Sequence, residues 1–230
     1  MNLKRLAAAE AVKLVEKGMI VGLGTGSTAR YAIEMIGERL QDGRLRDIVG
    51  IPTSSGSGRL ARQLDIPLST LQEHPVIDLT IDGADEVGPD LALIKGQGGA
   101  LLYEKIVARA SRHLVIIVDD SKLVTVLGGR SPLAVEVVRF GWGTYLAPLS
   151  ALGCDPIRRM QGAEPYLTDE GNYIVDCHFT HIDDPVRMEC ELNLIPGVIE
   201  NGIFNGLASL VYVASESGVR ELRPEQKCIR

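Results

Sequence analysis

The chain has 230 residues, of which 45% are hydrophobic and 23% charged, so it can form one large or two small domains with a full core. This composition excludes a largely disordered protein. The formal charge of −6 argues against a nucleic-acid partner, because nucleic-acid phosphates favour a basic face. No apolar run has the length of a membrane span and the first residues lack a signal-peptide pattern, so we expect a cytoplasmic protein without a membrane partner.

Helix-like and strand-like segments alternate through the first half of the chain. Helical spacing of apolar residues predicts a helix that ends at Gly18, one over 29–40 and one that ends at Leu64. Short apolar runs predict strands over 19–23, 48–51, 77–81, 91–94 and 114–118. This alternation predicts a parallel sheet with helices on both faces.

The order of elements changes near residue 131. Strands are expected over 133–138, 157–160, 173–177 and 198–204, and helices over 142–152 and 186–194. The resulting order, β-α-β-β-α-β, is that of a ferredoxin-like unit. A last pair of strands, 209–213 and 219–222, is expected to return to the first domain. The sequence therefore predicts an α/β protein with a Rossmann-like parallel-sheet domain (1–130 plus 206–230) and a smaller ferredoxin-like α+β domain (131–205).

Polar clusters follow the predicted parallel strands at 24–28, 52–57, 82–85 and 119–122. The carboxyl ends of such strands form the ligand crevice of open α/β sheets. The first cluster contains Thr25, Gly26, Ser27 and Thr28 and opens a helix. It lacks the third glycine of a dinucleotide fingerprint and the lysine of a P-loop. Its amides and hydroxyls could hold a phosphate, although a plain glycine turn with a helix cap also explains them.

Charged residues follow the strand that ends at residue 81. Asp82, Asp85 and Glu86 crowd one turn, and their mutual repulsion favours a functional site over a turn merely stabilised by aspartates. Lys95 is the candidate cation, unless it is a solvated lysine that precedes a helix. Glu104 lies in the helix that follows and could equally face solvent.

The cysteines are scattered along the second half of the chain: Cys154, Cys177, Cys190 and Cys228. They predict neither a disulfide framework nor a zinc ribbon. His178 and His181 with Cys190 could be proposed as a metal site, but a strand and the turn after it explain this spacing better. We expect no metal.

Four motifs carry a resemblance to a known family: GLGTGST (22–28), DLTIDGADEV (78–87), KGQGGALLYEKI (95–106) and VDDSKLV (118–124). In this order and spacing they resemble the A-type ribose-5-phosphate isomerase family, over nearly the whole chain. The resemblance implies an aldose–ketose isomerase of the pentose phosphate pathway that interconverts D-ribose 5-phosphate and D-ribulose 5-phosphate through an enediolate. It also implies no metal or organic cofactor, and a homodimer or homotetramer.

The resemblance also assigns residues. Glu104 corresponds to the catalytic base, and Lys4 to a further phosphate contact. The substrate-binding residues it implies are Thr25, Gly26, Ser27, Thr28, Asp82, Gly83, Ala84, Asp85, Lys95, Gly96, Gln97, Gly98 and Lys122. The family often has three glycines after the lysine, whereas this chain has Gln97 in the middle position; a positive φ there would strain it.

These residue types suit the chemistry. Glu104 could move the proton between C2 and C1, Lys95 could stabilise the enediolate oxygen, and Asp82 or Asp85 could open the sugar ring. Thr25–Thr28 and Lys122 could hold the phosphate. Two alternatives are a non-catalytic sugar-phosphate sensor and a CoA-transferase-like enzyme of similar fold whose glutamate is a nucleophile.

Overall fold

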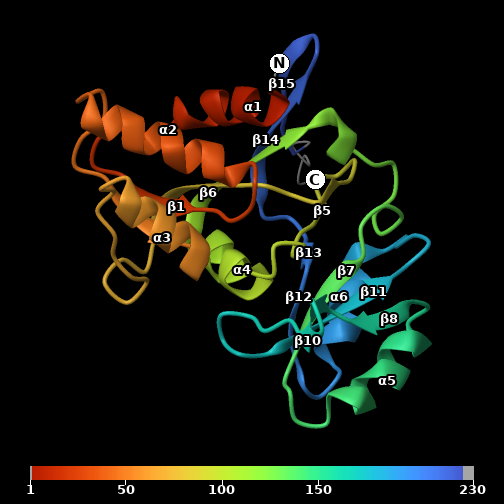
Figure 1. Ribbon diagram of the computed structural model, residues 1–230. Coiled ribbons are helices and arrows are strands. Elements are labelled where there is room, and N and C mark those ends of the chain that lie inside the picture. The colour runs from red at the N-terminus through yellow and green to blue at the C-terminus, as the bar shows by residue number, and fades with distance from the viewer. Residues whose placement is uncertain (1, 225–230) are drawn as a thin grey trace, which may run out of the picture. The chain divides into compact units, whose positions relative to one another are not determined.

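The computed structural model describes residues 2–224, so Cys228 lies outside the described residues. The chain divides into two compact units (Figure 1). Unit 1 consists of residues up to 84, 104–123 and those from 206 onward, and unit 2 consists of 85–103 and 124–205. The predicted domains, 1–130 plus 206–230 and 131–205, differ from this division at 85–103 and 124–130.

A six-stranded sheet forms the centre of unit 1, in the order β15-β14-β6-β3-β1-β2. Its strands are β1 (Ile20–Leu23), β2 (Val49–Pro52), β3 (Ile77–Asp82), β6 (Ser111–Asp119), β14 (Ala208–Ser215) and β15 (Gly218–Leu222). Neighbouring strands are parallel except for the terminal hairpin of β14 and β15. The predicted parallel sheet and the returning strand pair are confirmed.

The helices of this part of the chain are α1 (Leu3–Val12), α2 (Ala29–Gln41), α3 (Ser55–Gln63) and α4 (Leu101–Ala110). The prediction that the first helix continues to Gly18 is wrong, because α1 ends at Val12 and turns follow. A capping box formed by Ser54 and Ser57 fixes the start of α3. No helix among the described residues is long and apolar enough to cross a bilayer.

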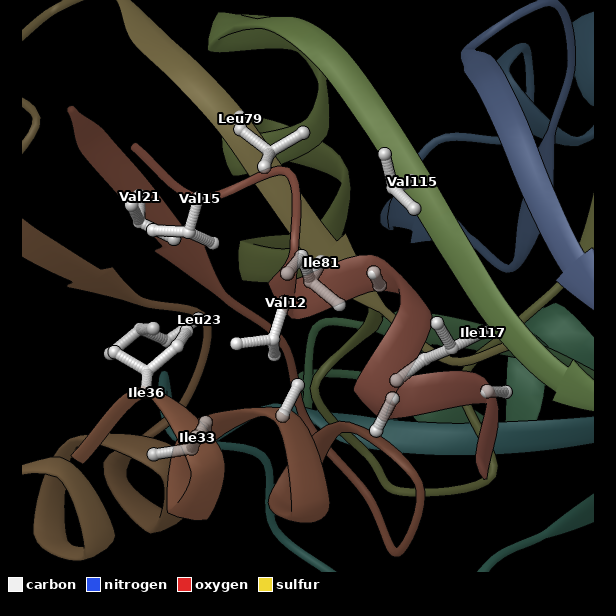
Figure 2. Close-up of a cluster of buried hydrophobic side chains, with 14 of the residues drawn as sticks. Val12, Val15, Val21, Leu23, Ile33, Ile36, Leu79, Ile81, Val115 and Ile117 are labelled. Atoms are coloured by element: carbon white, nitrogen blue, oxygen red, sulfur yellow. The ribbon is translucent and has the colours of Figure 1, made fainter. Parts of the chain in front are cut away.

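The core on one face of this sheet is built mainly from aliphatic side chains of α1, α2 and the strands β1, β3, β6 and β14, part of which Figure 2 shows. Alternate residues point to this face, as the period of a β-strand requires. The labelled members are Val12, Val15, Val21, Leu23, Ile33, Ile36, Leu79, Ile81, Val115 and Ile117. Because α4 covers the other face, the strands are buried on both sides and appear in the sequence as continuous apolar runs.

Unit 2 contains a four-stranded antiparallel sheet in the order β12-β7-β11-β8. Its elements are β7 (Leu133–Val137), α5 (Leu146–Ala151), β8 (Asp155–Arg158), β11 (Tyr173–His178), α6 (Pro185–Asn193) and β12 (Val198–Asn201). This order and pairing confirm the ferredoxin-like prediction. A 3₁₀ turn, Trp142–Tyr145, precedes α5 where one continuous helix was expected.

The smaller sheets of unit 2 contain the hairpin of β9 (Met160–Gln161) and β10 (Glu164–Pro165), and the three strands β4 (Glu86–Val87), β5 (Leu93–Ile94) and β13 (Ile203–Phe204). The single strand predicted over 198–204 is therefore wrong: it is β12 and β13, which belong to different sheets. Gly202 separates them, and a Cβ there would lie 2.1 Å from the carbonyl oxygen of Lys95.

Gly22 allows α4 to pack closely on the sheet. A Cβ at this position would lie 1.8 Å from Thr80 Oγ1 and 2.9 Å from Val107 Cγ1. Neither neighbour can move easily, because Thr80 is in the central strand β3 and Val107 is buried. The position of α4 on the sheet therefore depends on the absence of a side chain at residue 22.

We expect Gly22→Ala to lower the free energy of unfolding by about 1–3 kcal/mol through overpacking. Gly58→Ala is the matched control, since a Cβ there meets only ordinary contacts, the nearest at 3.5 Å, within α3. That control should raise stability by about 0.5–1 kcal/mol, because alanine suits a helix interior better than glycine. Urea unfolding of both variants measures the difference, and equal stabilities would contradict this account of the α4 contact.

Candidate active site

The polar clusters of unit 1 meet at one edge of its sheet. Since β1, β2, β3 and β6 are parallel, their carboxyl ends lie along the same edge, and the segments 24–28, 52–57, 82–84 and 119–122 follow these ends. Open parallel sheets bind ligands at this edge.

Asp82 fixes the loop that follows β1. Its carboxylate is buried, with 1% exposure, and its Oδ1 accepts hydrogen bonds from the backbone N–H of Thr25 at 3.1 Å and of Gly83 at 2.8 Å. Gly24 must be a glycine here, since a Cβ would lie 2.3 Å from Asp82 Oδ1. Asp82 thus lies in the candidate site and also fixes the backbone of the loop at its edge.

The hydroxyl groups of two strand ends are in contact. Thr25 Oγ1 lies 2.7 Å from Thr53 Oγ1 and donates to Ser54 Oγ at 2.8 Å. Sequence reasoning included Thr53 and Ser54 in a polar cluster but did not select them as site residues. The signal that could have selected them was their position directly after β2, next to the strand β1 that leads into the 25–28 loop.

Cationic side chains lie beside the 25–28 loop. Lys4 Nζ donates to Ser27 Oγ at 2.8 Å, which brings the start of α1 to the loop. A cavity of about 330 Å³ adjoins Gly24–Gly26 and is also lined by Arg30 and Arg59. Sequence reasoning missed both arginines, because helical surface arginines are common and carry no motif. Together these groups make the surroundings of the loop favourable for an anion.

Glu104 lies in the first turn of α4 and is 5% exposed. The last residues of α4 lead into Ser111, which pairs with Ile77 at the amino-terminal edge of the sheet, and Val107 reaches the level of Gly22 and Thr80. Glu104 is on the same helix face as Val107, about one 5.4 Å turn closer to the start of α4. Glu104 therefore lies nearer the carboxyl-terminal edge of the sheet than Val107 does.

Lys122 occupies the same edge of unit 1. It ends the 3₁₀ turn Asp120–Lys122, which follows β6 directly, and its side chain is half-buried. The side chain of Asp119 accepts from Ser121 N–H and so fixes this turn. The structure of unit 1 thus brings the 25–28 loop, Asp82, Glu104 and Lys122 to one edge.

The remaining predicted site residues belong to unit 2. Lys95 is 3% exposed, its Nζ lies 5.5 Å from the ring centroid of Phe204, and its N–H donates to Gly202 O at 2.9 Å. Asp85 Oδ2 accepts from the N–H of Gln97 at 3.0 Å. Within this unit, Asp85 and the loop 95–98 are therefore in direct contact.

The glycine loop accommodates Gln97. Positive φ angles occur at Gly96 (112°) and Gly99 (76°), whereas Gln97 is not among the non-glycine residues with positive φ in the described chain. The strain considered for Gln97 is therefore absent. Its side chain is exposed and replaces a glycine without a backbone penalty.

One sequence-based grouping does not hold. Glu86 does not belong to the aspartate turn: its buried carboxylate accepts from the N–H groups of Gly128, Arg130 and Ser131, at 2.7, 2.9 and 2.6 Å, and stabilises that loop. Within the described residues no group of three His, Cys, Asp or Glu is arranged to hold a metal ion. His181 instead pairs with exposed Asp183 at 3.3 Å.

Comparison with known proteins identifies the family. Residues 49–218 match the sequence model of ribose 5-phosphate isomerase A (phosphoriboisomerase A). The chain is 53% identical over 223 residues to ribose-5-phosphate isomerase A of Gloeobacter violaceus, covering 96% of each chain. Among solved structures, a D-ribose-5-phosphate isomerase in complex with phospho-erythronic acid is 45% identical with a TM-score of 0.94, covering 97% of this chain and 100% of that one.

A second solved structure, ribose 5-phosphate isomerase A of Methanocaldococcus jannaschii, is 44% identical with a TM-score of 0.92, covering 96% of this chain and 98% of that one. Both structures share the parallel sheet and the additional antiparallel sheets described above. The family match covers most of the chain and includes the strand-end motifs 78–87, 95–106 and 118–124. The chain belongs to the ribose 5-phosphate isomerase A family.

Proposed function

We propose that this chain interconverts D-ribose 5-phosphate and D-ribulose 5-phosphate, a step of the non-oxidative pentose phosphate pathway. The observation that carries the proposal is a buried glutamate, Glu104, placed at the same sheet edge as Asp82 and the 25–28 loop. It occurs in a chain about half identical to isomerases of the family. These relatives do not favour a sensor or a CoA-transferase-like enzyme.

Glu104 is the proposed base. The carboxylate removes the proton from C2 of the open-chain aldose, the C2–H electrons form the double bond of a cis-enediolate, and the same carboxyl group returns the proton to C1. O2 loses its hydroxyl proton as it becomes the ketone oxygen, and O1 gains a proton to become the C1 hydroxyl, so atoms and electrons balance without an external reductant. A positioned base of this kind contributes about 10²–10⁴ in rate.

Lys95 is the proposed partner of the negative oxygen. Its backbone N–H is bonded to Gly202 and its side chain is buried with the ammonium beside the Phe204 ring. An ammonium in a desolvated position stabilises a developing oxyanion strongly. Such a donor typically lowers the barrier by about 3 kcal/mol.

Asp85 is the better candidate to open the sugar ring. The buried carboxylate of Asp82 already accepts from two backbone N–H groups and fixes the loop, whereas Asp85 is half-buried. A half-buried carboxylate can exchange protons with a substrate hydroxyl and with water. Asp82 would then order the site, and its carboxylate would contact the sugar.

The phosphate is proposed to bind at the 25–28 loop. The loop leads into the first turn of α2, whose N–H groups favour an anion, and Thr28 caps that helix without a side-chain bond. Lys4, at the loop, and Lys122, at the same edge, supply positive charge. Binding energy at the phosphate would orient C1 and C2 at Glu104. The solved relative bound to phospho-erythronic acid, a phosphorylated sugar acid, supports a ligand of this class.

We also propose a cytoplasmic location and a homodimer or homotetramer, as the family resemblance implies. Light scattering after gel filtration would measure the number of subunits.

The function is tested with purified protein and ribose 5-phosphate in the presence of a chelator, by following formation of the ketose. Conversion to ribulose 5-phosphate is expected. A protein that binds the sugar phosphate but never forms ketose would be a sensor and not an isomerase.

We expect Glu104→Gln to leave substrate binding nearly intact and to lower kcat by about 10²-fold or more, because an amide cannot accept the C2 proton. Glu136→Gln is the matched control. Glu136 is equally buried, but it accepts from Thr168 and Asn172 in unit 2 and has no proposed role, so its variant should keep wild-type kcat. A Glu104→Gln enzyme with wild-type turnover would remove Glu104 as the base.

We expect Lys122→Ala to raise KM for ribose 5-phosphate by about tenfold or more, because a charged hydrogen bond to the phosphate is lost, and to change kcat less. Lys17→Ala is the control, since Lys17 pairs with Asp47 on the exposed surface. If KM is unchanged in Lys122→Ala, the phosphate binds elsewhere.

A further inference from the structure

A side chain outside the family motifs holds the glycine loop 95–98. Arg159 directly follows β8, and its Nη1 donates to the carbonyl oxygens of Gly96 at 2.8 Å and Gln97 at 3.1 Å. Its Nε donates to Asp176 Oδ2 at 2.9 Å, and its Nη2 donates to Oδ1 of the same carboxylate. The two side chains are 13% and 16% exposed, so water competes little for these bonds.

The Arg159–Asp176 pair is anchored to the four-stranded sheet of unit 2. Asp176 lies in β11, which pairs with both β7 and β8, and Arg159 N–H donates to Ile174 O at 2.8 Å. The ring centroid of Tyr166 lies 5.8 Å from the guanidinium carbon. Tyr166 also fills the space beside Gly99, where a Cβ would lie 2.1 Å from its hydroxyl oxygen. The sheet, the pair and the ring together leave the loop little freedom.

These bonds set the direction of two successive peptide groups. The carbonyls of Gly96 and Gln97 face Arg159, and in a trans peptide the following N–H points the opposite way. The N–H of Gln97 accordingly reaches Asp85 Oδ2. The N–H of Gly98 also points away from Arg159, and Gly98 is exposed. Without the guanidinium, both carbonyls could rotate toward the ligand side and present negative ends there.

We propose that Arg159, oriented by Asp176, is a positioning residue for the substrate-contacting loop 95–98. It turns the carbonyls of Gly96 and Gln97 away from the sugar and directs the Gly98 N–H toward a substrate oxygen. The inference rests on the proposed function. Because Asp176 offsets the charge of Arg159, the effect is geometric and does not replace the ammonium of Lys95. A lysine cannot supply the planar fork that spans one carboxylate and two carbonyls.

The test compares Arg159→Met/Asp176→Asn with Arg158→Met. The double variant removes the fork without leaving an unpaired buried carboxylate. Arg158 precedes it in the chain, and its guanidinium lies over Trp142, 4.2 Å from the ring centroid, so it controls for loss of an arginine from the same strand region. We expect the double variant to lose about 10- to 100-fold in kcat, as misplaced contacts typically cost, with a smaller change in KM. Arg158→Met should keep wild-type kcat.

Two further measurements separate positioning from general stability. Arg159→Lys keeps the ion pair and the fold, and it should still lose most of the kcat lost by the double variant. Hydrogen exchange of the Gln97 N–H should be faster in both Arg159 variants and unchanged in Arg158→Met. Folded Arg159 variants with wild-type kcat would overturn the proposal. If the wild-type protein is inactive, the proposed function is refuted instead. In that case, hydrogen exchange of the Gln97 N–H that is unaltered in the Arg159 variants would separately refute the ordering role of Arg159.

Discussion

The hydrogen bonds accepted by the Asp82 carboxylate hold the edge of the sheet on which the proposed site depends. In the register of β1 and β3, Leu23 pairs with Ile81, so the next residues, Gly24 and Asp82, emerge side by side. A buried carboxylate requires N–H donors, and Thr25 and Gly83 provide them. The same bonds that compensate the charge therefore shape the 25–28 loop. Thr25 extends the arrangement to the end of β2 through Thr53 and Ser54.

The position of the proposed base follows from a second constraint of the same sheet. Gly22 and Thr80 leave room for Val107, and this contact fixes how far α4 extends along the strands. Glu104 lies one turn before Val107 and so reaches the strand ends. Two glycines thus have separate effects: Gly22, in β1, leaves room for α4, and Gly24, directly after β1, leaves room for Asp82. The proposed catalytic carboxylate is thus carried by a packed helix and not by a loop.

Much of the fold follows from local sequence, and the exceptions have non-local causes. The apolar runs of β1, β3 and β6 and the glycine loop after β1 predicted the parallel sheet and its polar edge. The break at Gly202 could not be predicted, because it is imposed by the backbone of Lys95, more than a hundred positions away in the chain. Glu86 resembled its aspartate neighbours, yet the loop 128–131 supplies its partners.

The contacts of the candidate site likewise include some that local sequence cannot predict. Motifs selected the residues of the 25–28 and 95–98 loops, since their glycines and charges are close together in sequence. They could not select Arg159, whose position depends on the pairing of β8 with β11 and on Asp176 across that pair. An arginine after a strand has no recognisable spacing to the loop that it holds. Its role becomes visible only when the hydrogen bonds of the loop carbonyls are followed to their donor.

In the proposed reaction, one carboxyl group moves a proton between C2 and C1 through an enediolate. The direct measurement is NMR of ribose 5-phosphate and ribulose 5-phosphate held at equilibrium in D₂O with the wild-type protein for many turnovers. Proton transfer through an enediolate predicts that deuterium from solvent accumulates at C2 of the aldose and at C1 of the ketose, because the protonated carboxyl group can exchange with solvent while the enediolate is present, and this exchange adds up over many turnovers. Full retention of the original hydrogen while the sugars interconvert would contradict it.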